Sequence, residues 1–333
     1  MLRSIITGTG HAVPSRVVSN ADLSTQMDTS DEWIRSRTGI AERHWIEPGE
    51  RGVDLGKQAA LQALSSAGLD AGDLDAILYA TSTPDHFLPG NGVYLQRELG
   101  IAATIPAIDI RMQCAGFIYA LSIADAYVRT GAFRRVLVVG QEIQSTRMDV
   151  STEGRNTAVI FADGAGAVIL DATEASGERG LLAFDLHGDG SHAEKLWVEG
   201  PGCLVRPEQW PAELAEGRYW LKMDGREVFR HAVVRMPESV RAALQRAGEA
   251  PEHIALLIAH QANLRISEAV QKELGLADVQ TYNNIQRFGN TTAATIPIAL
   301  DECARSGRLK PGDLVVLTAF GSGFVWGACV LRW

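Results

Sequence analysis

The sequence predicts an α/β protein built from two similar halves, and three observations lead to this prediction. Helix-like and strand-like patterns alternate along all 333 residues, which is typical of layered α/β folds. Two helix–strand pairs that lie far apart in the chain have nearly the same order and spacing. A glycine-rich turn precedes an apolar strand near the end of each half, at 163–170 and 321–331. We therefore expect residues 1–173 and 174–333 to form the two halves.

The first helix–strand pair is a helix over 53–67, which Gly68 ends, followed by a strand over 75–81. The second is a helix that ends before Gly248, followed by a buried strand over 254–259 with His260 at its end. Apolar runs predict further strands over 105–108, 136–139 and 314–317. A helix is expected from Cys114 to about residue 130, with Gly131 as its stop signal.

An internal comparison supports the duplication. Residues 114–131 align with 290–307 without a gap, and both windows continue into an apolar strand. The identical pairs in this alignment are Asp125 with Asp301, Arg129 with Arg305, and Gly131 with Gly307. The alignment predicts that Cys114 and Asn290 occupy equivalent helix N-termini and face one cleft from opposite sides.

Composition and charge exclude several classes of protein. A net charge of −9 argues against a nucleic-acid coat or a polybasic membrane binder. The four cysteines form no CxxC pair, so neither a disulfide framework nor a zinc site is indicated, and a reducing, cytoplasmic setting fits. The apolar stretch at the N-terminus is too short for a signal peptide, and no run has the length of a membrane span.

Cys114 lies where the strand over 105–108 gives way to a helix. A thiol in the first turn of a helix faces free N–H groups and the positive end of the helix dipole, which favours the thiolate. The small residues Ala115 and Gly116 allow another backbone or a ligand to approach closely. The alternative is a buried, inert cysteine, which is the usual state of a free thiol.

Two other positions complete a candidate catalytic set. His260 ends a buried strand, and ligands of open α/β sheets bind at such strand ends. The amide of Asn290 is able to donate to a developing oxyanion, although a helix N-cap is its structural alternative. A nucleophilic Cys with His and Asn fits either papain-like hydrolysis or acyl transfer through a thioester. The duplicated α/β pattern does not suit a papain-like protease, and its local cysteine signature is absent.

These residues resemble β-ketoacyl-acyl carrier protein synthase III, a condensing enzyme of the thiolase superfamily that initiates fatty-acid synthesis. The resemblance covers nearly the whole chain. Its most specific segments are 28–34, 37–40, 114–117, 161–167, 260–265 and 289–291. The resemblance implies a thiolase fold, with two similar α/β halves in a five-layered αβαβα sandwich, and a homodimer.

The resemblance also implies a ping-pong Claisen condensation. Cys114 takes an acyl group from acyl-CoA, and malonyl-acyl carrier protein then loses CO₂ and attacks the thioester. His260 and Asn290 donate to the malonyl thioester oxygen, and the backbone amides of Cys114 and Ser322 form a second oxyanion hole. No metal or redox cofactor is expected, because the coenzyme A thioester is itself a substrate.

Binding residues follow from the same resemblance. Trp33 and Arg37 match positions that sandwich the CoA adenine, and Arg155 matches an arginine near the CoA nucleotide. An acidic enzyme that receives an acidic carrier protein needs a local basic patch. The residues expected to dock the carrier are Gln261, Arg265 and Arg230. For the arginines the structural alternative is a side chain that contacts only solvent, as exposed arginines usually do.

The chain departs from the family around the acyl pocket, where we place Leu88, Met112 and Gln113. Leu88 stands where an aromatic residue commonly limits the pocket across the dimer, and Met112–Gln113 stand where small residues are typical. The segment 196–221 is longer than usual and is expected to be a lid or wall of the acyl channel. These changes leave the identity of the primer open, and the alternatives are acetyl-CoA and a longer acyl-CoA.

Several alternatives remain open from the sequence. A related condensing enzyme or acyltransferase of a specialised lipid or secondary-metabolite pathway uses the same residues. A thioester hydrolase needs a route for water to the acyl-cysteine. A non-catalytic partner subunit usually lacks the nucleophile or the histidine, whereas Cys114, His260 and Asn290 are all present here. Whether the malonate is bound to carrier protein or to CoA is also open.

Overall fold

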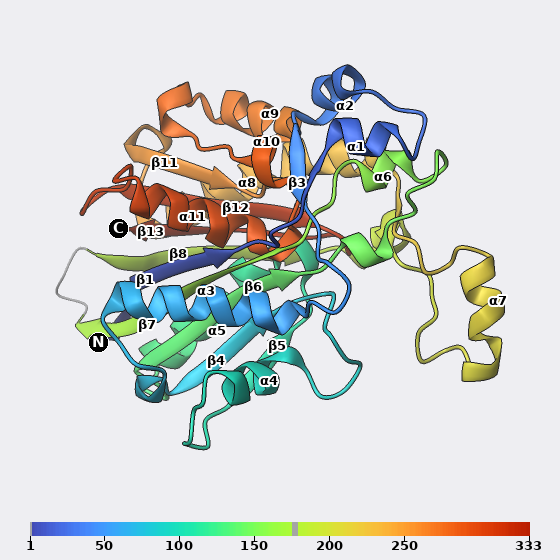
Figure 1. Cartoon of the computed structure of the whole chain (residues 1–333). Helices are drawn as coiled ribbons and strands as arrows, with labels where there is room; N and C mark the ends of the chain where they lie inside the picture. Colours follow the sequence, from blue (N-terminus) through green and yellow to red (C-terminus); the bar gives the residue numbers. More distant parts are fainter. Residues whose placement is uncertain (1, 175–178) are drawn as a thin grey trace.

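Two large β-sheets and three layers of helices make up the body of the fold, which alternates helix and sheet in five layers (Figure 1). The computed structural model describes residues 2–174 and 179–333. This arrangement confirms the predicted α/β class and the αβαβα sandwich. Among the described residues, no helix is both long and apolar enough to cross a membrane.

The first sheet has five strands. In spatial order they are β1 (Leu2–Ala12), β7 (Gly164–Glu174), β6 (Arg135–Glu142), β4 (Ala76–Ala80) and β5 (Ala107–Ile110). β7 runs antiparallel to both β1 and β6, while β4 runs parallel to β6 and to β5. β5 begins one residue after Pro106, because proline has no N–H for a sheet ladder.

The second sheet repeats this pattern with four strands. In spatial order they are β8 (Gly180–Gly188), β13 (Val325–Arg332), β12 (Leu314–Gly321) and β11 (Ile254–Ala259). β13 is antiparallel to both neighbours and β11 is parallel to β12, as in the first sheet. A single parallel bridge between Leu257 of β11 and Thr281 lies at the edge of this sheet, in the position that a fifth strand would take. The boundary at 173/174, near the end of β7, stays a prediction.

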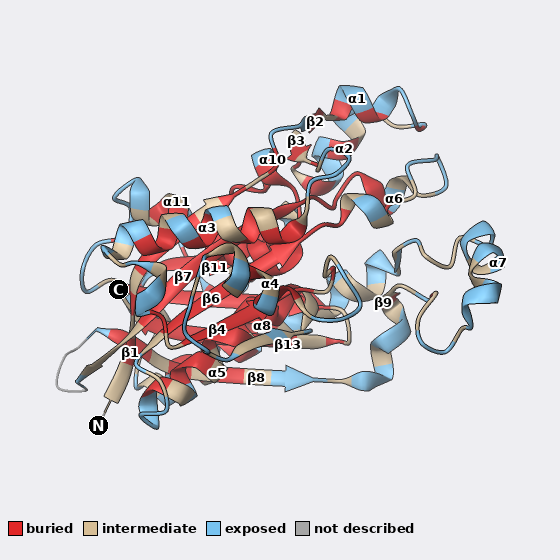
Figure 2. Ribbon diagram, turned by 60° about the horizontal axis from the view of Figure 1, so that its bottom comes forward, coloured by how far each residue is buried: buried red, intermediate tan, exposed pale blue. Residues whose placement is uncertain are grey.

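The strands of both large sheets are mostly buried (Figure 2), and alternate residues along them pack against different helix layers. In β4, Leu78 packs into the central layer against α5 (Gly116–Arg129) and α11 (Thr295–Arg305), while Ile77 faces α3 (Gly52–Ala67) on the outside. In β11, Ile258 faces the same central layer, while Leu257 packs outward with α8 (Gly225–Ala247) and α9 (Leu264–Leu274). α5 and α11 are therefore covered by a sheet on each side, which is why both are largely buried.

The predicted alignment of the two halves is correct at one end of the central helices and wrong at the other. Gly131 and Gly307 end α5 and α11 with φ of 75° and 68°. However, α5 has 14 residues and α11 has 11. Short 3₁₀ turns precede them at Gln113–Ala115 and Thr292–Ala294, so Ala293 rather than Asn290 matches Cys114. Asn290 lies before its turn and bridges to Phe161.

The remaining elements surround the sandwich. They are the helices α1 (Asn20–Ser24), α2 (Asp31–Thr38), α4 (Asn91–Glu98), α6 (Arg155–Ala158), α7 (Trp210–Ala215) and α10 (Ile285–Phe288), and the strand pairs β2 (Val17–Ser19) with β3 (Glu42–His44) and β9 (Leu196–Trp197) with β10 (Lys222–Met223). Helix α7 projects from the body of the molecule (Figure 1). It belongs to the segment 196–221 that the sequence singled out.

Candidate active site

Cys114 lies in the 3₁₀ turn between β5 and α5, at the centre of the molecule. The preceding residue, Gln113, has a φ of 43°, which turns the chain sharply before the thiol. The end of β12 packs directly on this turn. A Cβ on Gly321 would lie 2.8 Å from the Cβ of Cys114, so only glycine fits there. The thiol is held rigidly by this packing and is only 5% exposed.

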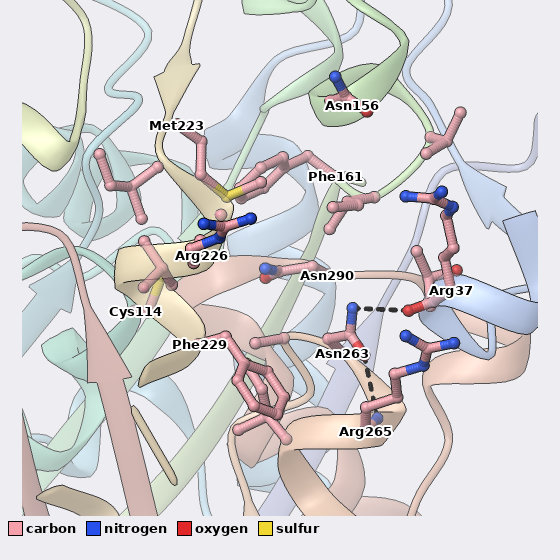
Figure 3. A pocket seen from close by; sticks show the side chains of 18 of the residues that line it. Arg37, Cys114, Asn156, Phe161, Met223, Arg226, Phe229, Asn263, Arg265 and Asn290 are labelled. Atoms are coloured by element: carbon pink, nitrogen blue, oxygen red, sulfur yellow. Dashed lines mark hydrogen bonds between the residues drawn. The ribbon is translucent and has the colours of Figure 1, made fainter. Parts of the chain in front are cut away.

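A cavity of about 480 Å³, here called the entrance cavity, opens on one side of the thiol. Cys114, His260 and Asn290 all line it, as predicted from the sequence. In Figure 3, Cys114 lies at one end, Asn290 lies beyond it, and Arg37 and Arg265 lie at the other end. The remaining lining is Trp33, Thr38, Asn156, Val159, Ile160, Phe161, Leu196, Met223, Gly225, Arg226, Val228, Phe229, Ala262, Asn263, Ile266 and Phe320.

A second cavity of about 260 Å³, here called the inner cavity, also borders Cys114. It shares Cys114, Phe161 and Leu196 with the entrance cavity. Its other lining residues are Ser82, Arg111, Gln113, Gln144, Arg147, Trp197, Val198, Leu221, Thr292 and Ser322. The thiol of Cys114 therefore lies between two separate cavities.

His260 follows β11, and its backbone N–H donates to the carbonyl of Thr318 on β12 at 2.7 Å. Its Nδ1 lies 2.7 Å from Oγ1 of Thr295, the first residue of α11. The side chain is 2% exposed, and burial lowers the pKa of His260 to about 3. The imidazole is therefore neutral at physiological pH.

Asn290 is placed by backbone contacts with the first half of the chain. Its N–H donates to the carbonyl of Ile160, and its carbonyl accepts from the N–H of Ala162. The side-chain oxygen accepts from the N–H of Thr292 at 2.8 Å. This contact fixes the orientation of the amide and leaves its NH₂ group as the donor for a ligand in the entrance cavity.

The thiol itself differs from the prediction. Burial raises the pKa of Cys114 to about 12, and the nearby carboxylate of Glu142 adds to the rise. The backbone N–H groups of Cys114 and Ser322 act in the opposite direction and lower the pKa. The expected thiolate is thus wrong, because desolvation raises the pKa of Cys114 more than the backbone N–H groups at this short turn lower it. The contribution of the two amides supports the predicted oxyanion hole.

Glu142 was missed by the sequence reasoning, although a charged residue at the end of an apolar strand was a usable signal. It is fully buried at the end of β6. Its carboxylate accepts from the backbone and hydroxyl of Ser82, the hydroxyl of Thr83 and the side chain of Gln144. Burial raises the pKa of Glu142 despite these bonds.

Replacing Glu142 by glutamine is expected to lower the pKa of Cys114, because it removes the negative charge that disfavours the thiolate. We expect alkylation of Cys114 by iodoacetamide to become about three- to ten-fold faster at pH 8, which corresponds to a pKa change of about 0.5–1. The rate is measured by mass spectrometry across a pH series. Asp125→Asn, at a buried carboxylate on α5, is the control and should leave the rate unchanged. An equal rate for Glu142→Gln and the parent protein would contradict the assignment.

The predicted CoA-binding residues lie together at the mouth of the entrance cavity. The guanidinium carbon of Arg37 lies 4.6 Å from the ring centroid of Trp33, and that of Arg155 lies 5.3 Å from it. Arg155 also donates to the carbonyl of Asp28 at 2.6 Å. Trp33 and Arg37 line the cavity, whereas Arg155 does not. Their roles stay predictions.

Of the three residues expected to dock a carrier protein, Gln261 is not available. It is 1% exposed, donates to the carbonyl of Ala259 at 2.8 Å and accepts from the N–H of Asn284 at 3.1 Å. This prediction is wrong, because the residue after His260 turns inward to join β11 to the following loop. Arg265 is exposed at the cavity mouth. Arg230 is exposed on α8, where it pairs with Glu227 at 2.5 Å.

The predicted acyl-pocket residues take three different places. Gln113 lines the inner cavity, but Met112 does not. Leu88 is 86% exposed and lines neither cavity of its own chain. Its predicted position across a dimer stays a prediction. Segment 196–221 contributes Leu196, Trp197, Val198 and Leu221 to the inner cavity, which fits its predicted role as a wall.

Comparison with known proteins gives consistent matches. The profile of 3-oxoacyl-[acyl-carrier-protein (ACP)] synthase III matches residues 108–190, and that of its C-terminal part matches residues 244–333. The chain is 45% identical to the β-ketoacyl-[acyl-carrier-protein] synthase III of Brucella suis, with 100% of both chains covered. Brucella abortus and Brucella melitensis have relatives with the same identity and coverage.

Solved structures agree. The crystal structure of 3-oxoacyl-[acyl-carrier-protein] synthase III from Aquifex aeolicus VF5 superposes with a TM-score of 0.90 at 39% identity, covering 99% of this chain and 100% of that one. The priming β-ketosynthase of the R1128 polyketide pathway gives a TM-score of 0.89 at 32% identity, covering 99% and 96%.

Proposed function

Because the chain belongs to the 3-oxoacyl-[acyl-carrier-protein] synthase III family, we propose that Cys114, His260 and Asn290 carry out its reaction. The chain is an acyl-transferring condensing enzyme. It joins the acyl group of an acyl-CoA to malonyl-acyl carrier protein, with loss of CO₂, in the initiation of fatty-acid synthesis. The observation that carries the proposed roles is the meeting of a thiol, an imidazole and an amide in one cavity, although they come from three distant segments.

In the first half-reaction, the sulfur of Cys114 attacks the carbonyl carbon of the acyl-CoA thioester. The bond between that carbon and the CoA sulfur breaks, and the thiol proton ends on the released CoA. With a thiol pKa of about 12, the proton must leave as the bond forms. His260 lines the same cavity and is proposed as the acceptor; because burial lowers its pKa, it passes the proton to the leaving CoA sulfur as the acyl bond forms and is not held as a stable imidazolium. The amides of Cys114 and Ser322 stabilise the oxyanion of the tetrahedral intermediate.

In the second half-reaction, malonyl-acyl carrier protein enters the same cavity. Loss of CO₂ leaves an enolate whose negative charge lies on the thioester oxygen. The NH₂ group of Asn290 and Nε2–H of His260 donate to this oxygen, and preorganised donors of this kind are commonly worth several kcal/mol. The carbanion then attacks the acyl group on Cys114, and the thiolate leaves.

In this proposal, His260 accepts a proton in the first half-reaction and donates a hydrogen bond in the second. Thr295 is placed to permit both, because its single hydroxyl proton has two acceptors in reach, Nδ1 of His260 at 2.7 Å and the carbonyl of Thr292 at 3.0 Å. When the hydroxyl donates to Nδ1, the imidazole proton is on Nε2. When it donates to Thr292, Nδ1 carries the proton and Nε2 is free to accept.

Replacing Thr295 by valine is expected to lower kcat for malonyl decarboxylation about ten-fold or more with little change in KM, because buried Nδ1 of His260 loses its partner. Thr295→Ser should restore most of the rate, since it returns the hydroxyl. The measurement is ¹⁴CO₂ release from labelled malonyl-carrier protein. A rise in KM alone, or a serine variant as impaired as valine, would show that Thr295 only fills space.

The entrance cavity is proposed to bind the pantetheine arm of both substrates. Trp33, Arg37 and Arg155 are proposed to hold the CoA nucleotide, since an aromatic face beside two guanidiniums suits an adenine with phosphates. Arg265 and Arg230 are proposed to dock the carrier protein. The chain has a net charge of −9, so local arginines at the cavity mouth offset the repulsion of an acidic partner.

A homodimer is also part of the proposal. β5 is an edge strand, paired only with β4 among the described strands, and an open edge favours pairing with a second copy. Phe87 and Leu88 are 71% and 86% exposed in the loop that precedes α4, beyond β4. We propose a cytoplasmic location, which the four free cysteines support, and chemistry without a metal or redox cofactor.

One experiment tests the function. The protein is incubated with a panel of acyl-CoAs, the mass added at Cys114 is read by peptide mass spectrometry, and malonyl-carrier protein or malonyl-CoA is then added. Transfer of the label into a 3-oxoacyl product is the expected result. Release of free acid instead of that product would favour a thioester hydrolase. Absence of any labelling would overturn the proposal.

A further inference from the structure

The far end of the inner cavity is built from arginines. Arg111 and Arg147 line this cavity and also a third hollow of about 730 Å³ that lies next to it. Cys114, by contrast, lines the inner cavity and the entrance cavity. The spaces therefore follow one another from the entrance cavity past the thiol to the two arginines. An acyl group on Cys114 that extends into the inner cavity points toward them.

Neither arginine has an anionic partner in the part of the chain that the structure describes. Arg147 donates to the carbonyl of Ser82 at 3.2 Å, and its guanidinium lies 5.7 Å from the ring centroid of Tyr219. These contacts orient the side chain without neutralising it. No hydrogen bond or ion pair within residues 2–174 and 179–333 involves the guanidinium of Arg111.

The carboxylates around these spaces are already engaged. Asp85 accepts from the backbone N–H groups of Gly52 and Val53. Glu199 pairs with Lys222 and Arg218. Glu142 is saturated by the neighbouring hydroxyl, amide and backbone groups described above. The charge of the two arginines is thus free for a ligand.

The walls between the thiol and the arginines are mixed. Phe161, Leu196 and Val198 offer apolar surface, while Gln113 and Gln144 offer amide groups. A purely hydrocarbon primer would press against two guanidiniums and remove water from them without replacing the lost hydrogen bonds. A chain of methylene groups that ends in a carboxylate would match both the apolar walls and the cationic end.

We propose that the preferred primer of this enzyme is the monothioester of a short dicarboxylic acid, whose free carboxylate binds Arg111 and Arg147 while its thioester carbon bonds to Cys114. The inference rests on the proposed function, since it requires an acyl group on this thiol. The chemistry is the same thioester exchange. Sulfur of Cys114 replaces sulfur of CoA on the acyl carbon, the thiol proton ends on CoA, and the distal carboxylate is unchanged.

The test compares primers of equal carbon number. Succinyl-CoA is set against butyryl-CoA, and glutaryl-CoA against valeryl-CoA, and labelling of Cys114 is followed by mass spectrometry in a single turnover before malonate is added. We expect the carboxylated primers to label the thiol about ten-fold faster or more, as charge-assisted hydrogen bonds to arginine would give. Omitting malonate ensures that the arginines are tested against the primer and not against the extender.

Variants assign the effect to the two side chains. Arg147→Met and Arg111→Met should each remove the preference for the carboxylated primers by slowing their labelling, while labelling by butyryl-CoA becomes faster, because its hydrocarbon end no longer desolvates a guanidinium. Arg147→Lys should keep part of the preference, because the charge remains but the planar fork is lost. The matched control is Arg134→Met, at an exposed arginine that lines neither cavity, and it should behave as the parent protein.

Three results would overturn the inference. Butyryl-CoA labelling Cys114 as fast as succinyl-CoA is one, and an equal loss for both primers in the arginine variants is another. The third is that a dimer dissociates in either arginine variant while the primer preference stays unchanged, as measured by analytical ultracentrifugation. This result would assign the arginines to a contact between subunits. In each case labelling and condensation still occur, so the proposed function stands. That function fails only if no primer labels the thiol or no label reaches the product.

Discussion

The Cys114→Ala protein is expected to acquire no acyl mass from any acyl-CoA, and its condensation rate should fall by on the order of 10⁴-fold or more, because the variant lacks the sulfur proposed to carry the acyl group. Decarboxylation of malonyl-carrier protein should persist in this variant, since His260 and Asn290 remain in the cavity. Intact-protein mass spectrometry and ¹⁴CO₂ release measure the two effects on the same sample.

The matched control is Cys303→Ala. Cys303 is also fully buried, but it lies in α11 away from both cavities, and burial likewise raises its pKa to about 12. The two cysteines therefore share a high thiol pKa. They differ in position, because only Cys114 lines the two cavities. Equal labelling of Cys114→Ala and Cys303→Ala would refute the assignment of the nucleophile.

The second large effect is expected at the oxyanion donors. Asn290→Ala should lower kcat for malonyl decarboxylation by about 10²–10³-fold, the usual cost of removing one preorganised donor. Acyl labelling of Cys114 should be affected much less, because in the proposed mechanism the acyl oxyanion is held by the backbone amides of Cys114 and Ser322 and not by Asn290. His260→Ala should reduce both steps if the imidazole also takes the thiol proton.

The informative measurement is the comparison of the labelling rate and the decarboxylation rate between Asn290→Ala and His260→Ala. His253→Ala is the control for the loss of an imidazole, because His253 is exposed, pairs with Glu249 and lines neither cavity. Decarboxylation by Asn290→Ala at the parent rate would show that the amide serves only to shape the turn, through its bond to Thr292. An equal loss of labelling and of decarboxylation in Asn290→Ala would show that Asn290 acts on the Cys114 thiol and not on the malonyl group.

The fold was predictable because its signals are local. Gly68, Gly131, Gly248 and Gly307 each follow a helix with positive φ, and apolar runs between them form the buried strands. The meeting of the three candidate catalytic residues in one cavity was predictable for a related reason. Cys114, His260 and Asn290 lie at the ends of regular elements, where α/β folds place functional groups, and recognisable residues flank each of them.

The remaining features depend on packing that the sequence does not display. The helix-dipole argument for a Cys114 thiolate failed because it ignored burial, which dominates the pKa. Glu142 ends β6 and Arg147 lies in the short turn just after it, but Thr295 reaches the site from α11, and no spacing in the sequence joins either segment to Cys114. Gln261 was misassigned because its neighbours in the sequence are functional while its own side chain is buried.

The shared central layer has a consequence for the history of this architecture. α5 comes from the first half and α11 from the second, and each is covered by both sheets. A half-length chain would leave its central helix uncovered, so a single half would be a stable protein only as a pair with a second copy. In such a pair both turns would have been identical. The present chain has a thiol in one turn and Ala293 in the other, so joining the halves in one chain frees each turn to carry a different residue, a thiol next to the cavities in one half and a buried packing residue in the other.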